Sequence, residues 1–271
     1  MLSILNSISS LTAETALSST QASLQKTLTE LSTGLKINSG SDDAAGLAIA
    51  NGLQANISAL TQSSQNASDG VGLLQTADGA LSQVTTLLNR AVTLATEAST
   101  GGLSTSQATA LDTEYQSILT EIGNIGTTTN FNGEAVFGTS ATVFTSDGTT
   151  SGSNTSTTAI AALTTTALGV KGTDLLTTAD AQTALTDISA AIQTVAANRG
   201  AIGASVNQLT ASSNVESTEV TNLTSAENNV QNADIGQTVA QMTQYNVLQQ
   251  TGMAALSQSN QAQQAVLKLL Q

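Results

Sequence analysis

Residues 53–95 read LQANISALTQSSQNASDGVGLLQTADGALSQVTTLLNRAVTLA, and their apolar side chains recur at alternating steps of four and three. Ser64, Asp78 and Thr85 are the polar residues that interrupt this series. A mean spacing of 3.5 residues keeps one stripe of a helix facing a partner helix in a left-handed supercoil. The stretch therefore predicts one long helix, over about 43–98, in a coiled-coil-like bundle.

The same spacing recurs in the rest of the chain. A short series runs from Leu111 to Ile125 and a longer one from Leu185 to Val230. Two further series lie at the chain ends, and polar residues interrupt the last one at positions where they can set the register between helices. We expect subunit contacts at these positions of the end series: Leu24, Leu28, Leu31, Leu35, Ile235, Val239, Met242, Asn246, Gln249, Met253, Leu256, Leu267 and Leu270.

Glycines and capping residues mark the expected helix ends. Gly34 closes the first helix, and Ser41 is expected to cap the next one, with Asp42 and Asp43 in its first turn, where the helix dipole favours negative charge. Two glycines followed by Ser104 separate the long helix from the short one. Adjacent side chains on a helix do not face each other, so we interpret the Asp pair as a helix start rather than a metal or acid–base site.

Residues 127–179 differ from the rest in composition. They contain all three Phe residues and many Ser and Thr, and 141–145 has the alternation of a strand. Together with the helical series, this predicts a mainly α fold. We expect an elongated antiparallel helical coiled-coil bundle with the N- and C-terminal helices paired and a small β-rich outer insert.

The composition excludes several classes of function. The chain has no Cys, His, Pro or Trp, so zinc fingers, thiolate nucleophiles and histidine-based triads cannot form. Nineteen acidic residues against six basic ones give a formal charge of −13, which repels nucleic acid and anionic lipid. No stretch approaches the roughly 20 apolar residues of a membrane span. We expect no enzyme, no catalytic, metal or cofactor-binding residue, no nucleic-acid binding and no membrane insertion.

Several motifs, in order along the chain, carry a resemblance to a known family. They are LSTGLKINSGSDDAAGLAIA at 31–50, NASDGVGLLQTADGAL at 66–81, TNFNG at 129–133, NAD at 232–234 and VLKLL at 266–270. In these motifs the sequence resembles bacterial flagellin, and the similarity extends over about 1–137 and 180–271.

The resemblance implies a structural subunit that self-assembles into the helical filament of the bacterial flagellum, used for swimming motility. It implies an extracellular homopolymer whose chains leave the cell through the flagellar type III export apparatus. The implied partners are the export apparatus, a chaperone, and the cap and hook-junction proteins. The N-terminus lacks the pattern of a cleavable secretory signal, which agrees with such export.

The resemblance also implies a domain organisation. Residues 1–42 with 232–271 would form a terminal coiled-coil domain in the filament core, 43–137 with 180–231 a helical shell domain, and 138–179 a short variable surface insert. In this family an innate immune receptor binds the long helix, which by resemblance assigns receptor contacts to Arg90, Leu94 and Glu114. Asn89, Thr93 and Ser117 depart from the family pattern in that region.

Three other interpretations remain open. A hook-filament junction protein of the same family would share the motifs at both chain ends. A signalling coiled coil of the chemoreceptor type would share the heptads rich in small and polar residues, but would need a membrane span or a hairpin tip, and the sequence shows neither. An enzymatic insert is the third, and the segment between the helical regions is short and contains no His.

Overall fold

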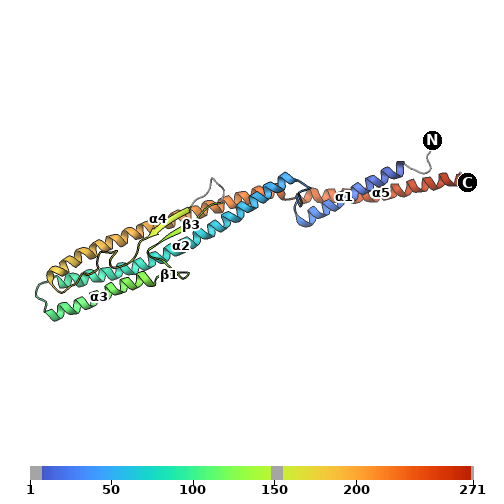
Figure 1. Cartoon of the computed structure of the whole chain (residues 1–271). Helices are drawn as coiled ribbons and strands as arrows, with labels where there is room; N and C mark the ends of the chain where they lie inside the picture. The colour runs from blue at the N-terminus through green and yellow to red at the C-terminus, as the bar shows by residue number, and fades with distance from the viewer. Residues whose placement is uncertain (1–7, 148–154, 270–271) are drawn as a thin grey trace. The chain divides into compact units, whose positions relative to one another are not determined.

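Long helices dominate the fold (Figure 1). The computed structural model describes residues 8–147 and 155–269, in which the helices are α1 (Ile8–Thr33), α2 (Ala44–Ala98), α3 (Thr105–Thr128), α4 (Thr178–Gln231) and α5 (Ile235–Leu269). The described strands are β1 (Asn130–Phe131), β2 (Glu134–Ala135), β3 (Thr139–Phe144) and β4 (Thr155–Ile160). They pair as two antiparallel hairpins, β1 with β2 and β3 with β4. The expected mainly α fold with a small β-rich part is confirmed.

The chain divides into two compact units. Unit 1 comprises residues 1–55 and 222–271, and unit 2 comprises residues 56–221. Helices α2 and α4 therefore contribute residues to both units. The three-part division expected from the sequence stays a prediction.

In unit 1 the connector after α1 pairs with the connector between α4 and α5. Helix α1 ends at Gly34, whose φ of +75° is a conformation that favours glycine, and the Gly34 N–H donates to the Glu30 carbonyl. The Lys36 N–H then donates to the Gln231 carbonyl, and the Ala233 N–H donates to the Gly34 carbonyl, both at 2.8 Å. These bonds join the two connectors immediately beside the α1–α5 pair.

The start of α2 corrects one expectation. Asp43, rather than Ser41, caps this helix, because its Oδ1 accepts from the backbone N–H groups of Ala45 at 3.0 Å and Gly46 at 2.9 Å. Asp42 lies before the helix instead of in its first turn. Ser104 does cap α3 as a capping box with Gln107, as its place after the two glycines indicates.

Unit 2 has a continuous hydrophobic core between α2, α3 and α4. Leu, Val and Ala supply most of it, and the largest fully buried side chain is Tyr115 of α3. The Tyr115 hydroxyl lies 2.6 Å from Thr173 Oγ1, so its polar end is hydrogen-bonded. Burial raises the pKa of this hydroxyl. The core thus consists mainly of aliphatic residues, with Tyr115 and Phe137 as its buried aromatic side chains among the described residues.

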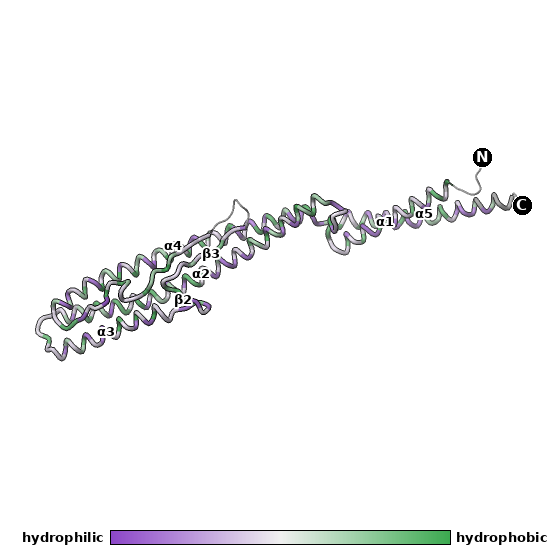
Figure 2. Tube along the Cα trace, in the orientation of Figure 1, coloured by the Kyte–Doolittle hydropathy of each residue, from purple (hydrophilic) through white to green (hydrophobic). Residues whose placement is uncertain are grey.

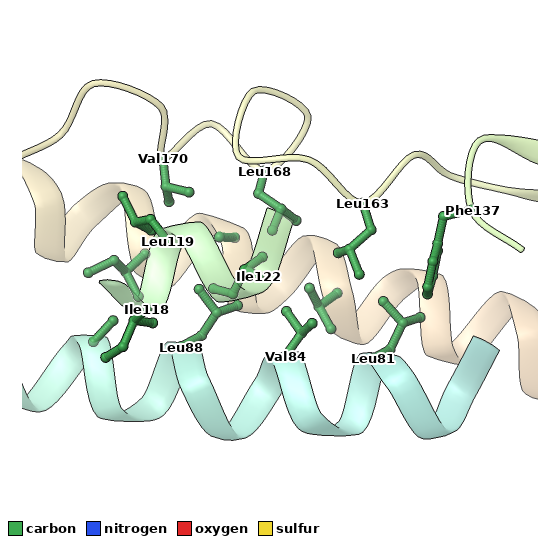
Figure 3. Packing of buried hydrophobic residues seen from close by; sticks show 14 of the residues in the cluster. Leu81, Val84, Leu88, Ile118, Leu119, Ile122, Phe137, Leu163, Leu168 and Val170 are labelled. Atoms are coloured by element: carbon green, nitrogen blue, oxygen red, sulfur yellow. The ribbon is translucent and has the colours of Figure 1, made fainter. Parts of the chain in front are cut away.

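Part of the expected surface insert belongs to this core. Leu163, Leu168 and Val170 point from the loop after β4 toward the helices (Figure 3), and each is at most 5% exposed. At Gly126 of α3 an added Cβ would lie 1.9 Å from the Leu163 carbonyl oxygen, so this glycine permits the close approach of the loop. The segment 138–179 therefore contributes packing energy as well as surface.

The β1–β2 hairpin has a tight two-residue turn. Asn132 and Gly133 join β1 to β2, and their φ values of 52° and 84° are those of a type I′ turn, which matches the twist of a two-residue hairpin. Strand β3 confirms the strand expected at 141–145, and its Val143 is buried against α2 and α4.

Hydrophobic and hydrophilic residues alternate along every helix (Figure 2). This is the pattern of helices that bury one stripe and expose the rest. Of the helices that the structure describes, none has the length and hydropathy needed to cross a bilayer.

Candidate assembly surface

Helices α1 and α5 of unit 1 pack side by side and run antiparallel. Ser10 Oγ lies 2.8 Å from Ser259 Oγ near one end of the pair. Further along, a Cβ added at Gly252 would lie 3.3 Å from Leu17 Cδ1. In both contacts the residue numbers sum to 269, so the register is constant over this length. It places Thr20 opposite Gln249.

The contact between the two helices is a thin seam in which small or polar residues are interspersed with Leu, Met and Tyr. Two side chains of the described parts of α1 and α5 are fully buried there, Thr27 at 3% and Thr238 at 5% exposed. Each hydroxyl donates to its own helix, Thr27 Oγ1 to the Ser23 carbonyl and Thr238 Oγ1 to the Asp234 carbonyl. The hydroxyls are thereby satisfied and the methyl groups are free to pack, as apolar side chains of the same size would.

The seam follows one heptad frame on each helix. Its members are partly or fully buried and recur at steps of three and four. On α1 they are Ala13, Leu17, Thr20, Leu24, Thr27 and Leu31, and on α5 they are Thr238, Met242, Tyr245, Gln249, Gly252 and Leu256.

The structure separates the residues expected at subunit contacts into two groups. One group is half-buried on the α1–α5 side of unit 1: Leu24, Leu31, Leu35, Met242, Asn246, Gln249 and Leu256. The other group is exposed: Leu28, Ile235, Val239 and Met253. Leu267 and Leu270 lie outside the residues whose side chains are described. Whether any of them contacts another chain stays a prediction.

The exposed group borders the seam. Leu28, Val239 and Met253 each follow a seam residue directly, so their side chains are about 100° away around the helix. Two further apolar residues, Val247 and Leu248, are 53% and 44% exposed on α5 and were missed by the sequence analysis. Their signal was weak because they fall outside the heptad frame. We call Leu28, Ile235, Val239, Val247, Leu248 and Met253 the flanking apolar set.

An ion pair holds the connector of unit 1. Lys26 Nζ of α1 lies 3.0 Å from Asp42 Oδ1, and Asp42 Oδ2 accepts from the backbone N–H groups of Asn38 and Ser39. The hydrogen bonds from Lys26 and Ser39 lower the pKa of Asp42 to about 2. Asp42 therefore stays ionised at neutral pH and ties α1 to the loop that leads into α2.

The residues implied as receptor contacts lie in unit 2. Arg90 of α2 and Glu114 of α3 form an exposed ion pair, with Nη2 2.7 Å from Oε1. Leu94 is 1% exposed and belongs to the hydrophobic core, and its contact with a receptor stays a prediction. Arg199 pairs with Asp78 of the same chain through two bonds of 2.7 and 3.1 Å.

The described residues contain no group of three His, Cys, Asp or Glu side chains placed to hold a metal ion. The chemistry of the surface is therefore that of apolar contact, amide and hydroxyl hydrogen bonds, and isolated ion pairs. Such a surface suits association between chains.

Two family models match the chain. Residues 4–142 match the bacterial flagellin N-terminal helical region, and residues 185–270 match the bacterial flagellin C-terminal helical region. Both long helices and both terminal helices fall largely within these matches.

Relatives and a solved structure agree with these matches. A flagellin of Halalkalibacterium halodurans is 36% identical with 91% of each chain covered, and a flagellin of Bacillus subtilis is 32% identical with 98% of each chain covered. The crystal structure of Bacillus cereus flagellin is 32% identical and superposes with a TM-score of 0.50, over 56% of this chain and 88% of that one. The chain belongs to the bacterial flagellin family.

Proposed function

We propose that the chain is a structural subunit that polymerises into the flagellar filament used for swimming, and that the flanking apolar set forms contacts between chains. One observation carries the assignment of the surface: the paired α1 and α5 bury each other only along a thin seam, while Leu28, Ile235, Val239 and Met253 beside it, and Val247 and Leu248 elsewhere on α5, stay exposed. Exposed apolar side chains on a paired set of helices can be covered by a further chain. The flagellin relatives support polymerisation as the reason for it.

The half-buried residues contribute to the same surface. The seam leaves the side chains of Asn246 and Gln249 partly open to solvent, where amides can bond across neighbouring chains. Burial of each half-exposed Leu or Val of the flanking apolar set would contribute about 1 kcal/mol. Many small contributions of this kind, repeated in every subunit, favour a polymer over a dimer.

We also propose the partners that accompany this role in the family. They are the type III export apparatus and a chaperone before assembly, and the cap and hook-junction proteins afterwards, with the polymer outside the cell. Arg90 and Glu114 remain candidates for contact with an innate immune receptor. The family is structural, and we assign the chain no enzymatic activity.

A pair of variants tests the proposed surface. The double substitution Val247→Gln and Leu248→Gln introduces residues of high helix propensity, so the helix is retained. It removes apolar surface from the flanking apolar set. We expect unchanged helicity of the monomer by circular dichroism and a critical concentration for polymerisation about tenfold to a hundredfold higher, from the loss of about 1.5–3 kcal/mol per subunit. Sedimentation and electron microscopy of the purified full-length chain measure this.

The matched control lies on the same helix. Gln244→Ala with Gln250→Ala changes two exposed polar residues outside the flanking set and should polymerise at the wild-type concentration. Polymerisation of the Val247 and Leu248 variant at the wild-type concentration would overturn the assignment of this surface. If the wild-type protein formed no filaments under any solution condition, the proposed function itself would be overturned.

A further inference from the structure

A buried polar cluster in unit 2 connects the end of β3 to α2 and α4. Its members are Ser63 of α2, at 1% exposed, Glu216 of α4, at 4%, and Ser146 after β3, at 4%. Ser63 Oγ lies 3.0 Å from Glu216 Oε1 and accepts from the Ser146 N–H at 2.7 Å. It also lies 3.3 Å from the Phe144 carbonyl oxygen. One serine hydroxyl thus joins a helix, a second helix and a hairpin.

Glu216 has few groups that could stabilise a negative charge. Its Oε2 is buried without a hydrogen-bond partner, and its Oε1 receives, besides Ser63, a long contact of 3.4 Å from Ser212 Oγ. Of the six basic residues of the chain, Lys26, Arg90 and Arg199 pair with other acids, and Lys36 donates to the Asn229 carbonyl. No ion pair to Glu216 occurs among the described residues.

The titratable neighbours of Glu216 are acidic. Glu219, one turn further along α4, opposes its ionisation, and Asp147 follows Ser146 on the hairpin side. On α2 the facing residues are Ser63 and Ser64, which carry no charge, and Ser64 pairs with Ser213 at 2.8 Å. Burial is the larger cause that raises the pKa of Glu216 above its ordinary 4.5.

Counting protons separates the two states of the cluster. A serine hydroxyl has one proton, so with an ionised Glu216 the Ser63 hydroxyl can donate either to the carboxylate or to the Phe144 carbonyl, but not to both. With a protonated Glu216, Oε1–H donates to Ser63 Oγ and the Ser63 hydroxyl donates onward to the Phe144 carbonyl. Ser63 Oγ then accepts two hydrogen bonds, from Glu216 and from the Ser146 N–H, and donates one.

We propose that Glu216 carries the proton of a buried hydrogen-bond chain that runs from Glu216 Oε1–H through the Ser63 hydroxyl to the Phe144 carbonyl, and that docking of the β3 end onto α2 and α4 requires this proton. The packing nearby supports the coupling to docking. At Gly70 of α2, an added Cβ would lie 2.5 Å from Val143 of β3 and 3.2 Å from Leu209 of α4, so the hairpin is in tight contact with both helices. The inference concerns unit 2 alone and is independent of polymerisation.

The sign of the pH dependence follows from the direction of the shift. An acid whose pKa is raised in the docked state binds more protons docked than free, so docking is strongest below the ordinary pKa of 4.5. It weakens as the pH rises from there through the raised value, and reaches its weakest level above it. Because one proton is involved, the docking equilibrium changes by at most about tenfold per pH unit in this window.

Two measurements on the full-length monomer test the proposal. The first is the titration of the Glu216 side-chain carboxyl carbon by NMR, which we expect to have its midpoint above 4.5. The second is amide hydrogen exchange of β3 and β4, corrected for the intrinsic rate at each pH, which we expect to lose protection as the pH rises. In Glu216→Gln, whose amide donates at every pH, the protection should no longer depend on pH.

Control variants separate this cluster from general charge effects. Glu219→Gln removes an exposed acid of the same helix and should keep the wild-type pH dependence. Ser63→Ala should reduce hairpin protection at every pH, whereas Ser64→Ala, whose hydroxyl pairs with Ser213, should leave the hairpin unchanged. Any one of three outcomes would overturn the proposal. They are a Glu216 titration midpoint at or below 4.5, hairpin protection in the wild type that does not depend on pH, and hairpin protection in Ser63→Ala equal to that of the wild type. The carboxyl titration decides even if a variant fails to fold.

Discussion

Two neighbouring aspartates of this chain have different tasks that their sequence position does not distinguish. Asp43 accepts from the first N–H groups of α2 and starts the helix, while Asp42 pairs with Lys26 and accepts from the loop before it. Adjacent side chains point in different directions, so a single helix start can serve both a cap and an ion pair. The expectation that both residues lie in the first turn was wrong, because α2 begins at Ala44, after both of them.

We predict an acid-sensitive connector at Asp42. Because its pKa is lowered to about 2, the stability that the ionised group contributes is fully present above its ordinary value of 3.8 and is lost as the pH falls through about 2. Asp42→Asn should raise the exchange of the Asn38 and Ser39 amides several-fold at neutral pH. The variant and the wild type should converge near pH 2. Equal exchange in the two proteins at pH 7 would contradict this role.

Two glycines of α3 provide a matched pair of substitutions. A Cβ at Gly126 would lie 1.9 Å from the Leu163 carbonyl oxygen, whereas a Cβ at Gly123 would meet nothing within 4 Å. Gly126→Ala should therefore lower the free energy of unfolding of unit 2 by about 1–3 kcal/mol through overpacking. Gly123→Ala should raise it by about 0.5–1 kcal/mol, since alanine favours the helix. Urea denaturation measures both, and changes of the same sign would show that the loop does not pack on α3 as described.

At the scale of elements, the buried positions of the α1–α5 seam in the described residues are threonines, and the apolar residues directly after them are exposed. In α1 the buried residue is Thr27 and Leu28 is exposed, and in α5 the buried residue is Thr238 and Val239 is exposed. A small side chain at the centre lets two helix axes approach closely. The larger apolar residues are thereby left at the border, where a further chain can cover them.

The polar positions of α5 test whether amides set the register of the assembled helices. Asn246→Leu with Gln249→Leu would make the half-buried side of α5 more apolar, and burial of a Leu contributes roughly 1.5–3 kcal/mol. We expect slower hydrogen exchange of α1 and α5 in the monomer, together with premature self-association or filaments of altered shape. The control, Gln244→Leu with Gln250→Leu, adds the same apolar area on exposed positions. If the first variant showed normal hydrogen exchange, filament shape and swimming, these amides would be tolerated surface residues that do not set the register.

At the scale of the whole molecule, the two units differ in how much apolar side chain they bury. Unit 2 holds the buried Leu, Val, Ile and Tyr side chains of a continuous core, and unit 1 holds a thin seam with Thr at its centre. A pair of helices with so little buried apolar area is marginal without further contacts. Assembly is the event that can supply them.

Truncation separates the two units. Removal of residues 1–30, or of residues 240–271, should leave unit 2 folded, with its core and its thermal transition intact, because none of its core residues lies in the deleted segments. Polymerisation should be lost. If both truncated chains still formed filaments of normal length and stability, the α1–α5 pair would not be the assembly element.

The net charge of −13 predicts that salt promotes assembly. Copies of an acidic chain repel one another as they pack, and the screening length falls from about 10 Å at 0.1 M salt to about 3 Å at 1 M. The critical concentration for polymerisation should therefore fall as NaCl rises from 0.05 to 0.5 M. A critical concentration that rises with salt would indicate that ion pairs between chains, rather than apolar contacts, dominate the interface.

The heptad pattern predicted the helices well because a period of 3.5 residues is a property of the chain alone. It placed every long helix and named half of each seam correctly: Ala67, Leu74, Leu81 and Leu88 of α2 are buried, as are Ile188, Val195, Ile202 and Leu209 of α4. Composition likewise removed thiolate, histidine and zinc chemistry from consideration, since those side chains are absent.

The other half of each seam is displaced by one residue from the predicted frame. The structure buries Ala77 instead of Asp78 and Ala91 instead of Val92 in α2, and in α4 it buries Ala191 rather than Ile192. For the pairs Ala91/Val92 and Ala191/Ile192, hydrophobicity favours the larger residue, but the space between closely packed helices admits the smaller one. Periodicity is local and can be read along the chain, whereas the choice between adjacent residues depends on the distance between two helices far apart in sequence. The same tertiary contacts placed Glu216 against Ser63 and left the flanking apolar set exposed.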